Sequence, residues 1–235
     1  MSQLQRIAIA PSQLQQGQIL LTKEQQHYLE RVLRLREGDR FIAMDGKGKW
    51  WLTQLAGEQA QVLEVLLVET ELPISITLMV ALPKGNGFDE VVRCCTELGV
   101  TCIAPVLSDR TLLHPSPQKL ERWQRIAAEA AEQSERSFVP TILEPVTFKT
   151  AVTANQTSHR YICEARGEYP HLNKVLNSIS EEIVIATGPE GGWTTQEVEN
   201  AIAFGFQPVS LGRRILRAVT APVVALSLIT AACEV

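Results

Sequence analysis

The fold is decided by two glycine-bearing turns, Thr187-Gly188-Pro189-Glu190-Gly191-Gly192-Trp193 and Leu211-Gly212-Arg213-Arg214-Ile215-Leu216-Arg217-Ala218. Each turn follows a short apolar run, at 183–186 and at 208–211, and each leads into a helical pattern. A strand, a glycine turn and a helix in succession is how a parallel α/β sheet presents backbone N–H groups to a small ligand. The repeated pattern predicts two adjacent strands that end in a ligand site at one edge of the sheet.

The first turn carries the stronger signal. Three glycines and a proline within 188–192 allow the main chain to approach a ligand closely and expose its amides. Thr194 with Glu197 forms a capping box, which predicts a helix directly after the turn. A tight strand-to-helix connection without a ligand explains one such loop equally well, and the second loop at Gly212 makes that alternative less favoured.

The chain from residue 71 onward alternates between strand and helix patterns. Strands are expected at 74–82, 102–107, near 141 and at 160–163, and helices at 88–98 and 119–136. This alternation predicts a parallel sheet with helices on both of its faces. Residues 69–73 form the expected linker, which places a boundary between domains at 1–70 and 71–235.

Residues before the linker predict a small antiparallel barrel or sheet. Strands are expected at 40–44, 49–55 and 61–68, with turn residues between them. Upstream, Thr22 with Gln25 makes a capping box for a helix that Gly38 ends. On that helix His27, Arg31 and Arg34 would share one face, which is either an RNA-binding surface or simply a solvated one.

Composition restricts the class of protein. With 45% hydrophobic and 20% charged residues the chain can bury a sizeable core, and its net charge of −4 means that any contact with nucleic acid comes from a local patch. Five cysteines without a C-x-x-C pair indicate reduced thiols in a cytoplasmic protein. The N-terminus shows no secretory signal, and the apolar stretch at 218–233 is too short to span a membrane.

Other kinds of site find little support. The Lys84-Gly85-Asn86-Gly87 stretch matches neither a Walker motif nor a dinucleotide fingerprint. The four histidines, at 27, 114, 159 and 171, are scattered, so no metal site is expected. No G-x-S-x-G elbow is present.

The two turns, taken with residues elsewhere, resemble the ribosomal RNA small-subunit methyltransferase E family of the SPOUT superfamily. The matching segments are the first turn, Leu211-Gly212-x-Arg214-Ile215-Leu216-Arg217 and Thr220-Ala221, then His27 with 32–34, Gly38-Asp39, Lys84, 97–100, Arg122-Trp123 and 129–136. The resemblance covers essentially the whole chain.

This resemblance implies a PUA-like N-terminal barrel and a C-terminal α/β domain with a trefoil knot. It further implies a homodimer that uses S-adenosylmethionine to methylate N3 of a uridine in 16S ribosomal RNA of the small subunit. Because the sulfonium makes methyl transfer a direct displacement, the protein's main tasks would be alignment and exclusion of water.

The resemblance also assigns roles to residues. The expected cofactor-binding residues are Thr187, Gly188, Pro189, Glu190, Gly191, Gly192, Leu211, Gly212, Ile215 and Leu216. Arg217 is the expected catalytic residue that orients the uracil or stabilises its developing anion, unless it only pairs with Glu190. Arg31, Arg34, Lys84 and Arg136 would grip RNA phosphates, although Arg136 has an alternative role in complementing the end of its helix.

One position departs from the family pattern. The family usually has Arg-x-Glu-Thr-Ala where this chain has Val219 in place of the carboxylate. Either the carboxylate is dispensable or another group, such as Glu190, takes its catalytic role. The valine leaves two alternatives open, namely a catalytically impaired ribosome-binding module and a SPOUT methyltransferase that acts on another RNA site.

Overall fold

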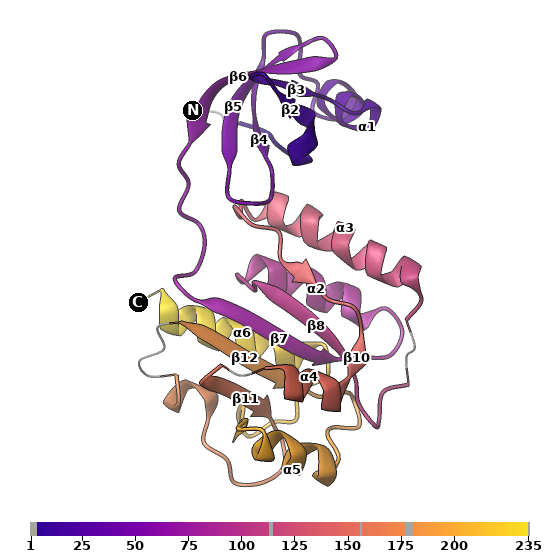
Figure 1. Cartoon of the computed structure of the whole chain (residues 1–235), viewed down its shortest axis with the longest axis vertical. Helices are drawn as coiled ribbons and strands as arrows, with labels where there is room; N and C mark the ends of the chain where they lie inside the picture. Colours follow the sequence, from indigo (N-terminus) through magenta and orange to yellow (C-terminus); the bar gives the residue numbers. More distant parts are fainter. Residues whose placement is uncertain (1–3, 113–114, 156, 177–180, 235) are drawn as a thin grey trace. The chain divides into compact units, whose positions relative to one another are not determined.

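The computed structural model describes residues 4–112, 115–155, 157–176 and 181–234 (Figure 1). The chain divides into two compact units, one of residues up to Glu71 together with Ala131–Val139, and one of Leu72–Ala130 together with the residues from Pro140 onward. A single boundary at 70/71 did not anticipate that residues 131–139 pack with the N-terminal unit.

The N-terminal unit is built on one six-stranded sheet with the order β1-β4-β5-β6-β3-β2. Its elements are β1 (Arg6–Ala8), η1 (Pro11–Gln13), β2 (Leu14–Gln15), β3 (Gln18–Leu20), α1 (Lys23–His27), η2 (Tyr28–Val32), β4 (Arg40–Met44), β5 (Trp50–Ala56) and β6 (Gln59–Leu66). All neighbouring strands are antiparallel except the parallel pair β1–β4. The predicted small antiparallel sheet is confirmed.

The adjacent tryptophans on β5 pack on opposite faces of this sheet. Trp51 joins the main core of the unit, whereas Trp50 packs with Ile42 and Met44 on the opposite face. This division follows from the alternation of side chains along a strand. Both rings are less than a tenth exposed, so they act as core residues and offer no stacking surface.

The expected helix after Thr22 is shorter than predicted. The Thr22–Gln25 capping box is present, but α1 passes into the π-helical turn η2, which ends at Val32. The chain then reverses at Arg34, whose φ of 58° lies in the left-handed region, and the Leu35 amide donates to the Leu29 carbonyl. The prediction that His27, Arg31 and Arg34 share one helical face is therefore wrong.

Residues 131–139 are held in the N-terminal unit by Glu71. Its carboxylate accepts hydrogen bonds from the amides of Ser137 (2.8 Å) and Phe138 (3.1 Å) and from the guanidinium of Arg136. The Glu132 carboxylate accepts a further hydrogen bond from the Ala8 amide at 2.9 Å. Glu71, the middle residue of the expected linker, is thus an anchoring point, because its carboxylate accepts hydrogen bonds from a segment that is remote in sequence.

The C-terminal unit contains a seven-stranded sheet with the order β10-β8-β7-β12-β11-β13, in which β9 also pairs with β8. The elements that follow the linker are β7 (Ser75–Ala81), α2 (Gly87–Glu97), β8 (Cys102–Leu107), α3 (Pro117–Gln133), β9 (Thr141–Ile142), β10 (Val146–Thr147), α4 (Phe148–Ala154), β11 (His159–Cys163), η3 (Leu172–Lys174), β12 (Glu182–Thr187), α5 (Thr195–Ala203), β13 (Gln207–Val209) and α6 (Thr220–Cys233). Every strand pair within this sheet is parallel, as the alternating pattern predicts.

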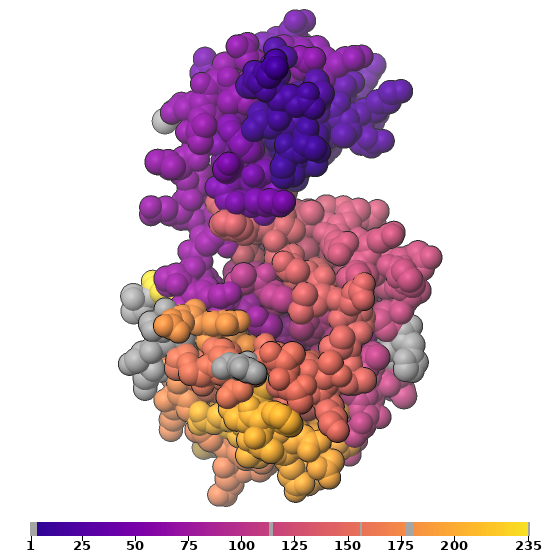
Figure 2. Space-filling view, in the orientation of Figure 1, coloured from indigo at the N-terminus to yellow at the C-terminus, as the bar shows by residue number. Residues whose placement is uncertain are grey.

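Helices cover both faces of the parallel sheet. Side chains of α4 and α5 pack in one core cluster with Met79, Ile162 and Val184 of the strands. These two helices lie side by side on the face seen in Figure 2. The alternate strand residues, such as Leu78 and Ile185, point to the other face, where α6 packs on β12 and α2 packs on α6.

The strand order corrects one expectation about the site. The strands that precede the two glycine turns, β12 and β13, are not adjacent, because β11 lies between them and pairs with both. Parallel strands nevertheless end at the same edge of a sheet, so all three carboxyl ends meet there. The trefoil knot that the resemblance implies stays a prediction.

The apolar stretch near the C-terminus forms α6, which is partly buried against the sheet. Within the described residues no helix has both the length and the apolar character needed to cross a membrane.

Candidate functional site

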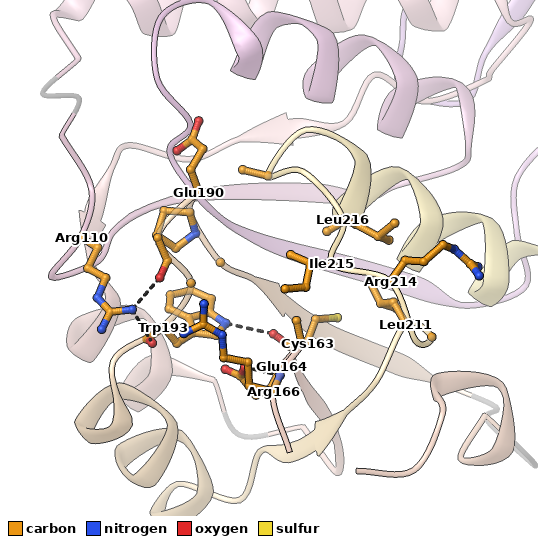
Figure 3. Close-up of a pocket in the computed structure, with 18 residues that line it drawn as sticks. Arg110, Cys163, Glu164, Arg166, Glu190, Trp193, Leu211, Arg214, Ile215 and Leu216 are labelled. Carbon is orange, nitrogen blue, oxygen red and sulfur yellow. Dashed lines mark hydrogen bonds between the residues drawn. The ribbon is translucent and has the colours of Figure 1, made fainter. Parts of the chain in front are cut away.

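The carboxyl ends of β11 and β12 and the loop after β13 enclose a pocket in the C-terminal unit (Figure 3). The pocket has a cavity volume of about 120 Å³ and opens to solvent. Its lining residues are Arg110, Cys163, Glu164, Ala165, Arg166, Gly188, Pro189, Glu190, Gly191, Gly192, Trp193, Leu211, Gly212, Arg214, Ile215, Leu216, Ala218 and Ala221. The two glycine turns thus meet in one cavity.

The first turn needs its glycines for steric reasons. Gly192 has a φ of 69°, a conformation that side chains disfavour. A Cβ atom at Gly188 would lie 3.2 Å from the indole of Trp193, and one at Gly191 would lie 3.1 Å from Cδ of Arg110. The turn ends in the Thr194–Glu197 capping box, whose presence confirms the predicted start of α5.

Trp193 fixes the first turn to the neighbouring strand. Its Nε1 donates a hydrogen bond of 3.1 Å to the carbonyl oxygen of Cys163 at the end of β11. Its ring packs on Phe148 of α4 with a centroid separation of 4.4 Å. The indole therefore ties the floor of the pocket to both the sheet and the helix layer.

The second turn leaves main-chain donors free for a ligand. Gly212 has a φ of 119°, and its amide donates to Oγ of Ser210 at 3.1 Å. Among the residues that the structure describes, the amides of Gly191, Ile215 and Leu216 donate to no protein acceptor. Backbone amides of this kind can hydrogen-bond the polar edge of a ligand.

Sequence reasoning missed two parts of the pocket. Residues 163–166 line it because β11 lies between the other two strands, and the shared edge of parallel strands is the signal that could have found them. Arg110 reaches the pocket from the loop after β8, where its Nη1 donates to the carbonyl oxygens of Gly191 (2.5 Å) and Trp193 (3.2 Å). Nothing in the local sequence of Arg110 indicates this role.

Charged groups of both signs surround the pocket. Three arginines, Arg110, Arg166 and Arg214, and two glutamates, Glu164 and Glu190, are among its lining residues. Burial raises the pKa of the Cys163 thiol to about 12, so this sulfur is neutral at physiological pH and is no nucleophile.

Most of the expected cofactor-binding residues lie on the pocket wall, and Thr187 does not. Thr187 is fully buried at the end of β12, and its hydroxyl is without a hydrogen-bond partner. Arg217 also stands outside the lining, with an exposed side chain and a backbone carbonyl that accepts from the amides of Thr220 and Ala221. No ion pair joins Arg217 to Glu190 within the described part of the chain.

The four arginines and lysines that were expected to bind RNA have different environments. Arg31 and Arg34 are exposed in the N-terminal unit, and Lys84 is exposed in the C-terminal unit. Arg136, by contrast, is only 4% exposed, and its Nη2 lies 2.5 Å from the Glu71 carboxylate. Burial and the ion pair give Arg136 a structural role, and its guanidinium is not exposed to RNA as those of Arg31 and Arg34 are.

A metal centre finds no support in the described residues, which contain no cluster of three or more histidine, cysteine, aspartate or glutamate side chains suited to an ion. His114 lies outside the described residues.

The groups that line the pocket fit the adenosine part of S-adenosylmethionine. The wall combines apolar side chains of Pro189, Leu211 and Leu216 with the free amides of both turns. Apolar surface accommodates a purine ring, while main-chain groups recognise its polar edge without needing polar side chains.

Family models place both units among RNA-modifying enzymes. A model of the RNA methyltransferase domain matches residues 70–230, and a model of the RNA methyltransferase PUA domain matches residues 21–66. The ribosomal RNA small subunit methyltransferase E of Synechocystis is 52% identical over 97% of this chain and 78% of its own length. That of Bacillus subtilis is 31% identical over 89% of this chain and 88% of its own length. The chain belongs to the ribosomal RNA small subunit methyltransferase E family.

Solved structures agree with this assignment. The Neisseria gonorrhoeae ribosomal RNA small subunit methyltransferase E, bound to S-adenosyl methionine, has a TM-score of 0.88 and 33% identity, over 97% of this chain and 98% of that one. A putative methyltransferase of Legionella pneumophila, in complex with the cofactor, has a TM-score of 0.86 and 28% identity, over 98% of each chain.

Proposed function

We propose that this protein transfers the methyl group of S-adenosylmethionine to N3 of a uridine in 16S ribosomal RNA, in the cytoplasm. The observation that carries the proposal is the pocket in which both glycine turns meet, within a chain of the methyltransferase E family. When bound, S-adenosylmethionine supplies a methyl group activated by its sulfonium. The chain must therefore align the two reactants and exclude water between them.

The two turns form the proposed methyl-donor site. Gly188–Gly192 and Leu211–Leu216 bring free amides and apolar side chains to the same cavity. Arg110 and Trp193 hold the first turn in place by donating hydrogen bonds to main-chain carbonyls. The site is thus pre-organised by contacts that do not involve the ligand.

Arg217 is the proposed catalytic group toward the uracil. Its backbone carbonyl is held by the first turn of α6, while its exposed guanidinium is available to a substrate beside the pocket. Loss of the N3 proton leaves a negative charge on the uracil, and a nearby cation stabilises that charge as it develops. Arg31, Arg34 and Lys84 are the proposed contacts to RNA phosphates, since all three are exposed.

A homodimer is proposed as the working form. Helix α6 is rich in apolar residues, and Val223, Val224 and Leu228 remain only half-buried in the single chain. A second copy that covers this face would remove their apolar surface from water. Light scattering at micromolar concentration should give twice the mass of the chain, and a monomeric mass would contradict the dimer.

Binding of the methyl donor is tested by calorimetry with Gly191→Arg. A side chain at this position meets Arg110 and must enter the pocket, so the affinity for S-adenosylmethionine should fall at least tenfold. Ala203→Arg is the matched control, because it adds the same charge at an exposed position of α5. If both variants bound S-adenosylmethionine as tightly as the wild type, this pocket would not be the methyl-donor site.

Methyl transfer is tested with radiolabelled S-adenosylmethionine and small subunits that lack the modification, followed by mass mapping of the product. Label on N3 of one uridine, with a rate reduced by Arg217→Ala, is the expected result. Donor binding without transfer, unaffected by Arg217→Ala, would instead indicate a ribosome-binding module. Label at another RNA position would indicate a different target for the same chemistry.

A further inference from the structure

The short turn of residues 83–87, which connects β7 to α2, is bonded to the first glycine turn and lies against the residue that follows the second. The amide of Lys84 donates a 3.0 Å hydrogen bond to Oε1 of Glu190 in the first turn. At the other end, a Cβ atom on Gly87 would lie 2.7 Å from Cγ1 of Val219, which follows the second turn. The turn thus contacts the protein on both sides of the proposed methyl-donor site.

A third contact ties the same turn to the helix layer. Oδ1 of Asn86 accepts a hydrogen bond of 2.7 Å from Nζ of Lys119 in α3. Next to it, the Asp89 carboxylate in the first turn of α2 accepts from Arg122 and from the indole of Trp123. These bonds hold the backbone of the turn while the Lys84 side chain stays exposed.

The position of Glu190 suits a structural tie better than proton abstraction. Figure 3 shows its carboxylate pointing away from Trp193 and Cys163, the residues at the floor of the pocket. One of its oxygens is already engaged by the Lys84 amide. Residue 219 is a valine, which supplies no carboxylate and packs against Gly87.

We propose that Glu190 is a positioning residue, which fixes the 83–87 turn so that the Lys84 ammonium meets an RNA phosphate beside the methyl-donor pocket. In this role Glu190 is not the base that removes the uracil proton. Val219 supports the same turn by packing, which accounts for an apolar residue at that position. The inference rests on the proposed function, because it names the RNA contact of the same site.

The hydrogen bond between the Lys84 amide and the Glu190 carboxylate is tested without any measurement of activity. Exchange of the Lys84 amide, followed in a peptide that covers residues 82–88, should be roughly ten times faster in Glu190→Ala, because this amide loses its acceptor. Glu190→Gln should recover most of the protection, since a side-chain amide oxygen still accepts a hydrogen bond. Glu199→Ala, on an exposed glutamate of α5, is the matched control. Unchanged exchange in Glu190→Ala would overturn the proposal whether or not the protein methylates RNA.

Steady-state kinetics separates positioning from base catalysis. A positioning role predicts that Glu190→Ala raises KM for the small subunit by about five- to tenfold, and that Glu190→Gln recovers it with the shape of the pH–rate profile retained. Lys84→Ala should raise KM similarly, and the double variant should show little further loss because both changes act on one contact. A base would instead lose kcat about 10²–10⁴-fold in both Glu190 variants. That outcome, or full additivity with Lys84→Ala, would overturn the proposal.

Discussion

Replacing Glu71 or Arg136 should destabilise the N-terminal unit by about 3–5 kcal/mol, the usual cost of removing one partner of a buried ion pair. Glu71 accepts hydrogen bonds from Arg136 Nη2 (2.5 Å) and Nε (3.2 Å) and from the amides of Ser137 and Phe138. Its loss therefore removes the acceptor that engages Arg136, Ser137 and Phe138 of the remote segment.

The two substitutions should differ in size. The side chain of Arg136 is 5% exposed, whereas that of Glu71 is 25% exposed. Glu71→Ala leaves the more deeply buried charge without its carboxylate, so its cost should lie near 5 kcal/mol, and that of Arg136→Ala should lie near 3 kcal/mol. Glu71→Gln should fall between wild type and Glu71→Ala because an acceptor oxygen remains.

Urea unfolding, followed by tryptophan fluorescence and circular dichroism, measures these free energies, with Trp50 and Trp51 reporting on this unit. Glu129→Ala is the control, since its pair with Arg125 is 3.6 Å long and both side chains are two-thirds exposed. It should cost less than about 1 kcal/mol. If the Arg136→Ala variant were as stable as the wild type but bound RNA more weakly, the structural role of Arg136 would be refuted.

Three further outcomes follow from the C-terminal unit. Trp193→Phe should lower the unfolding free energy by about 1–3 kcal/mol, because the carbonyl of Cys163 loses its donor, and thermal unfolding will measure the change. Thr194→Ala should cost about 1 kcal/mol through loss of the α5 cap, and Thr194→Ser should restore it in the same assay. Stability should fall as pH rises above 9, because burial holds the pKa of Cys102 at about 11 and that of Cys163 at about 12 while unfolded thiols ionise near 9. Each thiol contributes up to about 1.4 kcal/mol per pH unit there, so Cys163→Ala should flatten the profile of unfolding midpoints between pH 8 and 10.5.

Local patterns were enough to predict most elements of this protein. The strand at 102–107 matches β8, and both capping boxes, at Thr22 and at Thr194, are present where the sequence placed them. These features depend on residues within a few positions of each other, so neighbouring side chains carry the signal. The helix after Thr22 is the exception, because the reversal at Arg34 depends on a backbone conformation that helical periodicity does not encode.

The site was predictable only in part. Glycines mark the turns because a close approach of the main chain requires them, and the structure gathers both turns in one pocket. Arg110 and residues 163–166 were missed because strand order, which has no local signature, brings them to the same edge. The hydrogen bond from the Lys84 amide to Glu190 joins residues 106 positions apart, and the local sequence of neither segment predicts it.

The sequence by itself determined that the two glycine turns end strands of a parallel α/β sheet, since periodicity and steric needs are properties of short stretches. The tertiary structure alone decided which strand lies between the turns, that Arg136 is buried on Glu71, and that Glu190 and Val219 contact one turn. Such contacts depend on packing between distant segments, whose partners are selected by the whole fold and not by local residue preference.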